Sequence, residues 1–142
     1  MAALTVTAAD VALIEGTPMS TLVSRASEAI TRGAVIRLVP ATGLWALANA
    51  DTAGGAGNQR WFALHDVAAN ETLTGVRDCL IDLGDDVFDG LNFDAPIYLS
   101  DTVSTVKGLI TATVGESAEA TIVGYIVPMW SGPTVQRILR AV

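Results

Sequence analysis

The chain has few of the residues that form cross-links or bind metal ions. Its 142 residues include one cysteine and one histidine. A single cysteine excludes an intrachain disulfide, and Cys79 lacks the Cys/His spacing of a zinc site. A lone thiol is typical of a chain that folds in a reducing cytosol. We therefore expect Cys79 to occupy a small, buried, apolar position, and we expect neither a metal ion nor a cofactor.

Segments that enter membranes are missing as well. No apolar run approaches the roughly 20 residues that span a bilayer. The first residues lack the basic stretch that precedes the apolar part of a secretory signal. The sequence therefore predicts no membrane partner.

Basic residues are scarce, with eight Lys and Arg against fifteen Asp and Glu and a net charge of −7. Nucleic-acid binding needs a basic stripe, so we expect no nucleic-acid partner. The acid is concentrated between Arg77 and Lys107, where no basic residue interrupts it. The acidic residues there are Asp78, Asp82, Asp85, Asp86, Asp89, Asp94 and Asp101. We interpret them as a solvated outer face. A calcium loop over residues 82–90 is the alternative, but it lacks the required ligand spacing and closing glutamate.

Aromatic residues make up only 6% of the chain, although 51% of it is hydrophobic. Much of that apolar fraction is alanine, which buries little surface per residue. We therefore expect a thin core, and self-association is a natural way to bury more surface.

Two similar stretches are the clearest signal that the sequence contains. Residues 33–38 and 94–99 each read as an apolar strand that leads into a polar turn. A second strand then restarts at Gly43 in the first case and at Gly108 in the second. Alternating side chains with glycine at the turn are typical of antiparallel hairpins.

Further strands are predicted over residues 21–26, 60–65, 72–83, 109–114 and 121–129, and a short one over residues 28–33. This regular spacing indicates an all-β fold, a small β-barrel or sandwich of antiparallel hairpins. We divide the chain into an extended N-terminal arm (1–19), a β-barrel domain (20–130) and a C-terminal tail (131–142). The tail follows the break at residues 132–133 and is either an edge strand or a short helix.

The arm has apolar residues but little core of its own. Residues 4–7 alternate like a short strand, and residues 8–14 fit one or two helical turns with Asp10 as N-cap. Such an arm packs either on its own barrel or on a neighbouring subunit or partner, and the sequence leaves both open.

No set of catalytic residues is recognisable. His65 and Asp66 lack a nucleophile in a known motif. Paired carboxylates for sugar hydrolysis are conceivable among the aspartates, but few aromatic platforms accompany them. The glycine-rich loop at residues 54–57 has no following Lys-Ser/Thr and opens no helix, so it does not predict a phosphate site.

The tryptophans Trp45, Trp61 and Trp130 are candidates either for the core or for an interface. Trp61 and Phe62 are adjacent, so in a strand they point to opposite faces. One of them must then lie outside a single-layer core, either on a partner surface or in a second packed layer. Trp130 follows Pro128 at a predicted strand end, where it could anchor an interface.

Four stretches of the sequence, by their order and spacing, resemble the capsid cement (head decoration) proteins of tailed bacteriophages. They are residues 28–51, residues 62–71, residues 94–101 and residues 122–128. The family often has glycine where this chain has Asn70, and residues 77–79 depart from its pattern. The arm and the tail fall outside the resemblance.

The resemblance implies a small β-barrel subunit, commonly a homotrimer, that binds the major capsid protein on the outer surface of the virion and stabilises the expanded shell. It implies synthesis in the host cytoplasm and a structural role without catalysis. The candidates for capsid or subunit contacts are Leu4, Val6, Val11, Leu13, Ile14, Trp61 and Trp130. The alternative is a head fibre or adhesin base that binds host-surface glycans, and a small hydrolase is a remote third reading.

Overall fold

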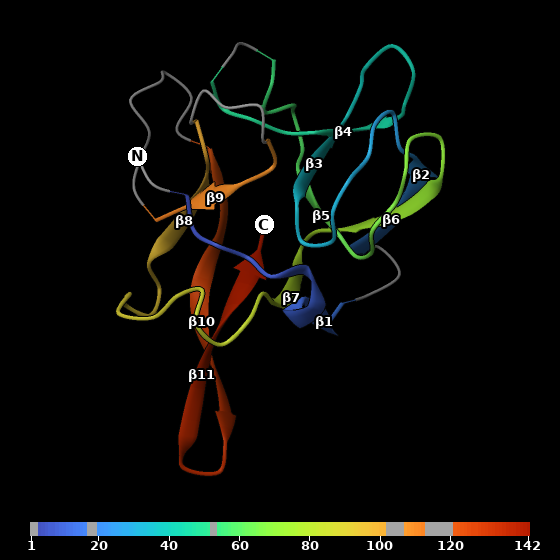
Figure 1. Ribbon diagram of the computed structural model, residues 1–142. Helices are drawn as coiled ribbons and strands as arrows, with labels where there is room; N and C mark the ends of the chain where they lie inside the picture. Colours follow the sequence, from blue (N-terminus) through green and yellow to red (C-terminus); the bar gives the residue numbers. More distant parts are fainter. Residues whose placement is uncertain (1–2, 17–19, 52–53, 102–106, 113–120) are drawn as a thin grey trace.

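The computed structural model describes residues 3–16, 20–51, 54–101, 107–112 and 121–142. Its described part is all-β apart from one 3₁₀ turn, η1 (Ala8–Asp10) (Figure 1). The strands are β1 (Ala12–Glu15), β2 (Thr21–Arg25), β3 (Val35–Leu38), β4 (Trp45–Leu47), β5 (Trp61–Ala63), β6 (Thr72–Val76), β7 (Cys79–Asp82), β8 (Pro96–Leu99), β9 (Ile110–Thr111), β10 (Ile122–Ser131) and β11 (Thr134–Ala141). The all-β prediction is confirmed.

The strands form two antiparallel sheets. The six-stranded sheet has the order β1-β7-β11-β10-β8-β9, and the five-stranded sheet has the order β2-β6-β5-β3-β4. Both predicted hairpins are present, because β3 pairs with β4 and β8 pairs with β9. Residues 28–33 form no strand, and Ile30 makes only an isolated bridge to Val67.

The prediction of one strand over residues 72–83 is wrong. The chain bends after β6, and Asp78 adopts a left-handed backbone with φ of 51°. Ser20 Oγ donates a hydrogen bond to the Asp78 carbonyl and holds this corner. The bend passes the chain from the five-stranded sheet to the six-stranded sheet, as at the corners of packed sheets.

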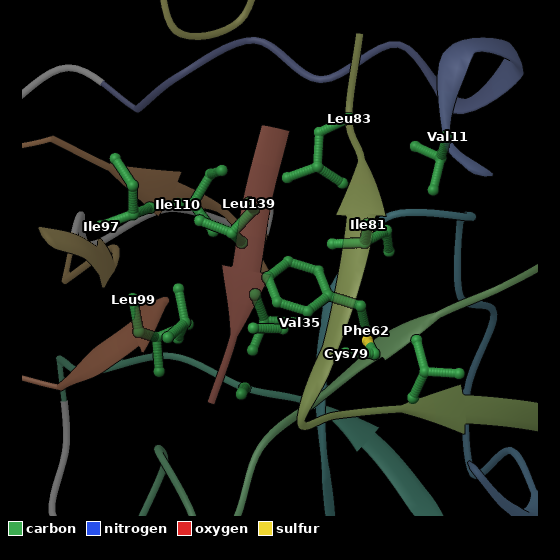
Figure 2. Packing of buried hydrophobic residues seen from close by; sticks show 14 of the residues in the cluster. Val11, Val35, Phe62, Cys79, Ile81, Leu83, Ile97, Leu99, Ile110 and Leu139 are labelled. Atoms are coloured by element: carbon green, nitrogen blue, oxygen red, sulfur yellow. The ribbon is translucent and has the colours of Figure 1, made fainter. Parts of the chain in front are cut away.

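The main core lies between the two sheets. It combines Phe62 and Val35 of the five-stranded sheet with aliphatic residues of the other sheet, including Ile81 and Leu139 (Figure 2). Cys79 belongs to this core and is 5% exposed, which confirms its predicted buried role.

A second cluster lies on the opposite face of the five-stranded sheet. Trp45 and Trp61 meet there edge to face, with ring centroids 5.1 Å apart. Trp45 is fully buried, and its indole N–H donates to the Leu73 carbonyl at 2.9 Å. The adjacent residues Trp61 and Phe62 therefore occupy two separate cores, so the second-layer alternative is the one observed.

No closed barrel is found among the described residues. The five-stranded sheet curls until Ala26, just after β2, makes an isolated bridge to Trp45 of β4. Ser27 adds backbone and hydroxyl hydrogen bonds to the Trp45 carbonyl. These contacts connect the end of β2 to β4, but the two edge strands do not pair along their length.

Residues 3–16 are joined to the six-stranded sheet, to which β1 belongs. Leu4 N–H donates to the Ile110 carbonyl at 2.8 Å, and β1 pairs with β7. Residues 4–7 form no strand, and the helical expectation for residues 8–14 holds only for η1. Thr7 occupies the N-cap position and Asp10 ends the turn, so the predicted Asp10 cap is wrong.

The last residues form a strand, as one of the two alternatives predicted, but not an edge strand. β11 lies between β7 and β10 in the six-stranded sheet. It pairs with β10 over eight residue pairs, from Gly124↔Ala141 to Ser131↔Thr134. The helical alternative is excluded.

Candidate functional site

The β10–β11 hairpin extends beyond the packed sheets (Figure 1). Pairing of β10 with β8 ends at Tyr125, and pairing of β11 with β7 begins at Leu139. Between these points the two strands pair only with each other. We call residues 127–137 the projecting hairpin.

One face of the projecting hairpin continues the face that lines the main core. Ile126 and Leu139 form a cross-strand pair and are both fully buried in that core. Because side chains alternate along a strand, Trp130 and its partner Val135 lie on the same face, beyond the core. Trp130 is 65% exposed, which places a large aromatic side chain in solvent.

Arg137 anchors the base of this exposed face. Its Nε donates to the Leu91 carbonyl at 2.8 Å, and its guanidinium carbon lies 4.5 Å from the centroid of the Phe93 ring. Phe93 is itself 38% exposed. The loop before β8 therefore extends the apolar surface of the hairpin through a cation–π contact.

The turn at the tip is defined by its two residues. Gly132 has φ of +59°, and the ring of Pro133 fixes φ near −65°. A type I′ turn needs positive φ at both positions, so this combination indicates type II′, which suits a two-residue hairpin. The tip is consequently a tight and rigid connection.

Pro128 blocks the free edge of β10. Counting from the closing pair Ser131↔Thr134, the pair Pro128↔Arg137 falls at a position without hydrogen bonds between the strands. Proline therefore costs the hairpin no bond, and it removes an N–H from the edge that no strand covers. Edge prolines prevent uncontrolled strand pairing, so contacts here are directed to side chains.

The hairpin differs in charge from the rest of the chain. Residues 122–142 contain Arg137 and Arg140 but no Asp or Glu, while the whole chain carries −7. The described aspartates at positions 78, 85, 86, 89 and 94 are exposed, in agreement with a solvated acidic face. The hairpin itself is apolar and weakly basic, and it meets the acidic stretch at its base, where Gln136 Nε2 donates to Asp82 Oδ1 at 2.9 Å.

The other predicted interface residues fall into two groups. Leu13 and Ile14 of β1 are 36% and 42% exposed and remain available for contacts. Val11 and Trp61 are buried within this chain at 0% and 6%, and Leu4 and Val6 are half-buried against the main core. Sequence reasoning missed the exposed residues Leu22, Val23 and Phe93. The alternating pattern of β2 was visible in the sequence, but its position at the edge of the five-stranded sheet was not.

His65 and Asp66 are each engaged with the backbone. Thr74 N–H donates to His65 Nε2 at 3.3 Å, and Arg32 N–H donates to Asp66 Oδ1 at 2.7 Å. Burial, and next the nearby Asp78 charge, raise the pKa of the Cys79 thiol to about 11. This thiol is therefore protonated and weakly nucleophilic at neutral pH.

Among the described residues, no group of three or more His, Cys, Asp or Glu side chains is placed to hold a metal ion. Within the same residues, no helix has the length and apolar character to cross a membrane. Comparison with family models, curated proteins and solved structures gave no match to this chain.

Proposed function

We propose that this chain is a structural virion protein that binds the outer surface of a phage capsid and stabilises the expanded shell. The observation that carries the proposal is the exposed face of the projecting hairpin, where Trp130 is 65% exposed. Exposed apolar patches mark interaction sites, and tryptophan and arginine are enriched among the residues that dominate interface energies. The resemblance of four stretches of the sequence to cement proteins supports the same function.

The proposed partner is the major capsid protein, and attachment to the virion surface places the acidic residues towards solvent. Many equivalent copies on a symmetric shell would each oppose separation of neighbouring capsid subunits. A weak contact per copy is then sufficient, which suits a small apolar face such as this hairpin.

The direct test mixes the purified protein with expanded, undecorated capsids of the phage that encodes it. We expect saturable binding at a fixed number of copies per shell and a higher shell melting temperature by calorimetry. Absence of binding, or binding that leaves shell melting unchanged, would contradict the proposal.

Self-association as a homotrimer is part of the same proposal. Apart from the hairpin, the edge strands β1 and β2 expose apolar residues that are candidates for contacts between copies: Leu13, Ile14, Leu22 and Val23. Light scattering on the purified chain should give three times its mass of 14.7 kDa. A monomer at all concentrations would contradict the trimer, and the capsid-binding experiment would still test attachment.

A head fibre or adhesin base that binds host glycans is the second candidate function. The observation that favours it is again Trp130, because an exposed indole can stack on a sugar ring. Glycan-array binding that is lost in Trp130→Ala, or after replacement of residues 54–58, would favour this alternative. An array without signal would exclude it for the glycans displayed.

A further inference from the structure

A groove of about 560 Å³ lies beside β3, on a different part of the molecule from the projecting hairpin. One wall is formed by Arg37, Leu38 and Pro40, and the other by the loop that precedes β5, with Trp61 also in the lining. This volume is in the range of pockets that bind small molecules, which combine apolar walls with a few polar groups.

Arg37 is held in place by its surroundings. The β3–β5 pairing ends at Ile36↔Trp61, so Arg37 and Arg60 follow at the same end of these two strands. A Cβ added at Gly57 would lie 2.8 Å from Arg37 Cβ, which means that the loop backbone rests directly on the arginine stem. The Nε of Arg37 is buried and has no hydrogen-bond partner among the described residues, so this guanidinium has donor capacity left for a ligand.

Arg60 supports the same loop from beneath. Its Nη1 donates to the carbonyls of Gly57 and Asn58, at 3.0 and 3.4 Å. Burial lowers the pKa of Arg60, and the positive charge of nearby Arg77 lowers it further. Cationic groups therefore gather at this end of the five-stranded sheet.

Carboxylates do not neutralise this cluster fully. Arg77 Nε lies 3.3 Å from Asp78 Oδ2. Within the described residues, neither Arg37 nor Arg60 forms an ion pair, although acidic residues outnumber basic ones fifteen to eight in the chain. An anion in the groove would relieve the repulsion between these guanidinium groups.

We propose that this groove binds a small oxyanion, a phosphate or carboxylate group, through the guanidinium of Arg37. Planar guanidinium groups bind both kinds of oxyanion in bidentate fashion. Leu38 and Pro40 form an apolar part of the lining, where an apolar body attached to the anion would lie. This site is independent of the proposed capsid attachment.

The test titrates the full chain with inorganic phosphate and, separately, with succinate at low ionic strength, followed by amide NMR shifts. We expect saturable shifts confined to residues 37–40 and 54–61. Arg37→Met keeps the aliphatic stem but removes the charge, and should weaken binding about tenfold or more. Arg25→Met, which removes an exposed arginine on β2, is the matched control and should bind as the wild type.

Saturation by phosphate alone or by succinate alone supports the site and identifies which oxyanion it takes. Absence of saturable shifts with both probes overturns the proposal, and so does equal affinity in Arg37→Met and the wild type. If Arg37→Met fails to fold, the location of the wild-type shifts decides, because shifts outside the groove contradict the site.

Discussion

Gly75 is the residue on which the packing of the second core depends most closely. A Cβ added there would lie 2.9 Å from Trp45 Cζ2 and 3.1 Å from Trp61 Cβ. Both tryptophans are held, Trp45 by its hydrogen bond to Leu73 and Trp61 by the ring contact. The neighbours therefore have little room to move away from a methyl group at this position.

We expect Gly75→Ala to lower the free energy of unfolding by about 1–3 kcal/mol, the usual cost of overpacking a core. Urea unfolding measures this effect. Gly16→Ala is the matched control, because its Cβ would meet neighbours at 3.5 Å, an ordinary contact distance. Equal stability of the two variants would show that the tryptophan pair is packed less tightly than described.

Cys79 gives a prediction that depends on pH. With a pKa of about 11, only about one thiol in a thousand is ionised at pH 8. Iodoacetamide should therefore modify the folded chain far more slowly than the chain unfolded in guanidinium chloride. Similar rates in both states would contradict the burial of this thiol.

The same raised pKa couples Cys79 to stability. The unfolded thiol loses its proton near its ordinary pKa of 9.0, and the folded thiol only near 11. This stabilising contribution is complete below pH 9 and is lost as the pH rises towards 11. Wild type should therefore lose more stability than Cys79→Ala over that interval, and parallel curves would contradict the shift.

Some left-handed residues were not predictable from the sequence alone. Asn70, in the turn before β6, has φ of 71°. Asn and Asp adopt this conformation more readily than other side chains. Asp78 at 51° gave no comparable signal, because nothing local marks where a strand changes sheets.

At the scale of elements, the N-terminal segment belongs to the packed structure. Val11 is fully buried in the main core, and Arg32 Nη2 donates to its carbonyl. A Cβ at Gly33 would lie 2.7 Å from Val11 Cγ2, so the segment fits closely over the left-handed glycine, whose φ is +87°. The apolar pattern of this segment was visible in the sequence, but the surface that it covers was not.

We expect Val11→Ala to destabilise the chain by about 2 kcal/mol, the order of a lost buried aliphatic group with its cavity. Ile14→Ala, at a side chain 42% exposed, should change stability by less than about 0.5 kcal/mol. Thermal unfolding followed by circular dichroism measures both. A neutral Val11→Ala would mean that residues 3–16 are not part of the core.

The hairpin shows how far sequence patterns reach at this scale. Gly132 and Pro133 were predicted only as a break, and the strand before them was predicted to end at residue 129. The actual strand β10 runs to Ser131, and β11 gains a second partner in β7. Local periodicity cannot reveal that pairing, because β7 lies more than fifty residues earlier in the chain.

At the scale of the whole molecule, the projecting hairpin differs in charge from the rest of the chain. Its strands β10 and β11 contain no Asp or Glu, and the hairpin extends away from the packed sheets (Figure 1). The sequence left Trp130 as a candidate for the core or for an interface, the latter because it follows Pro128 at a predicted strand end. The sequence could not predict that Phe93 lies beside the hairpin, because this depends on its contact with Arg137 of β11, more than forty residues later in the chain.

The most direct test of capsid attachment compares Trp130→Ala with Met129→Ala in binding to expanded, undecorated capsids. Met129 is the neighbouring residue on the opposite face of β10, so it controls for general damage to the hairpin. We predict that Trp130→Ala keeps the wild-type melting temperature but weakens capsid binding about 30-fold or more, as loss of an aromatic anchor does. Met129→Ala should bind within about threefold of the wild type. Capsid affinity of Trp130→Ala equal to that of the wild type would contradict the account.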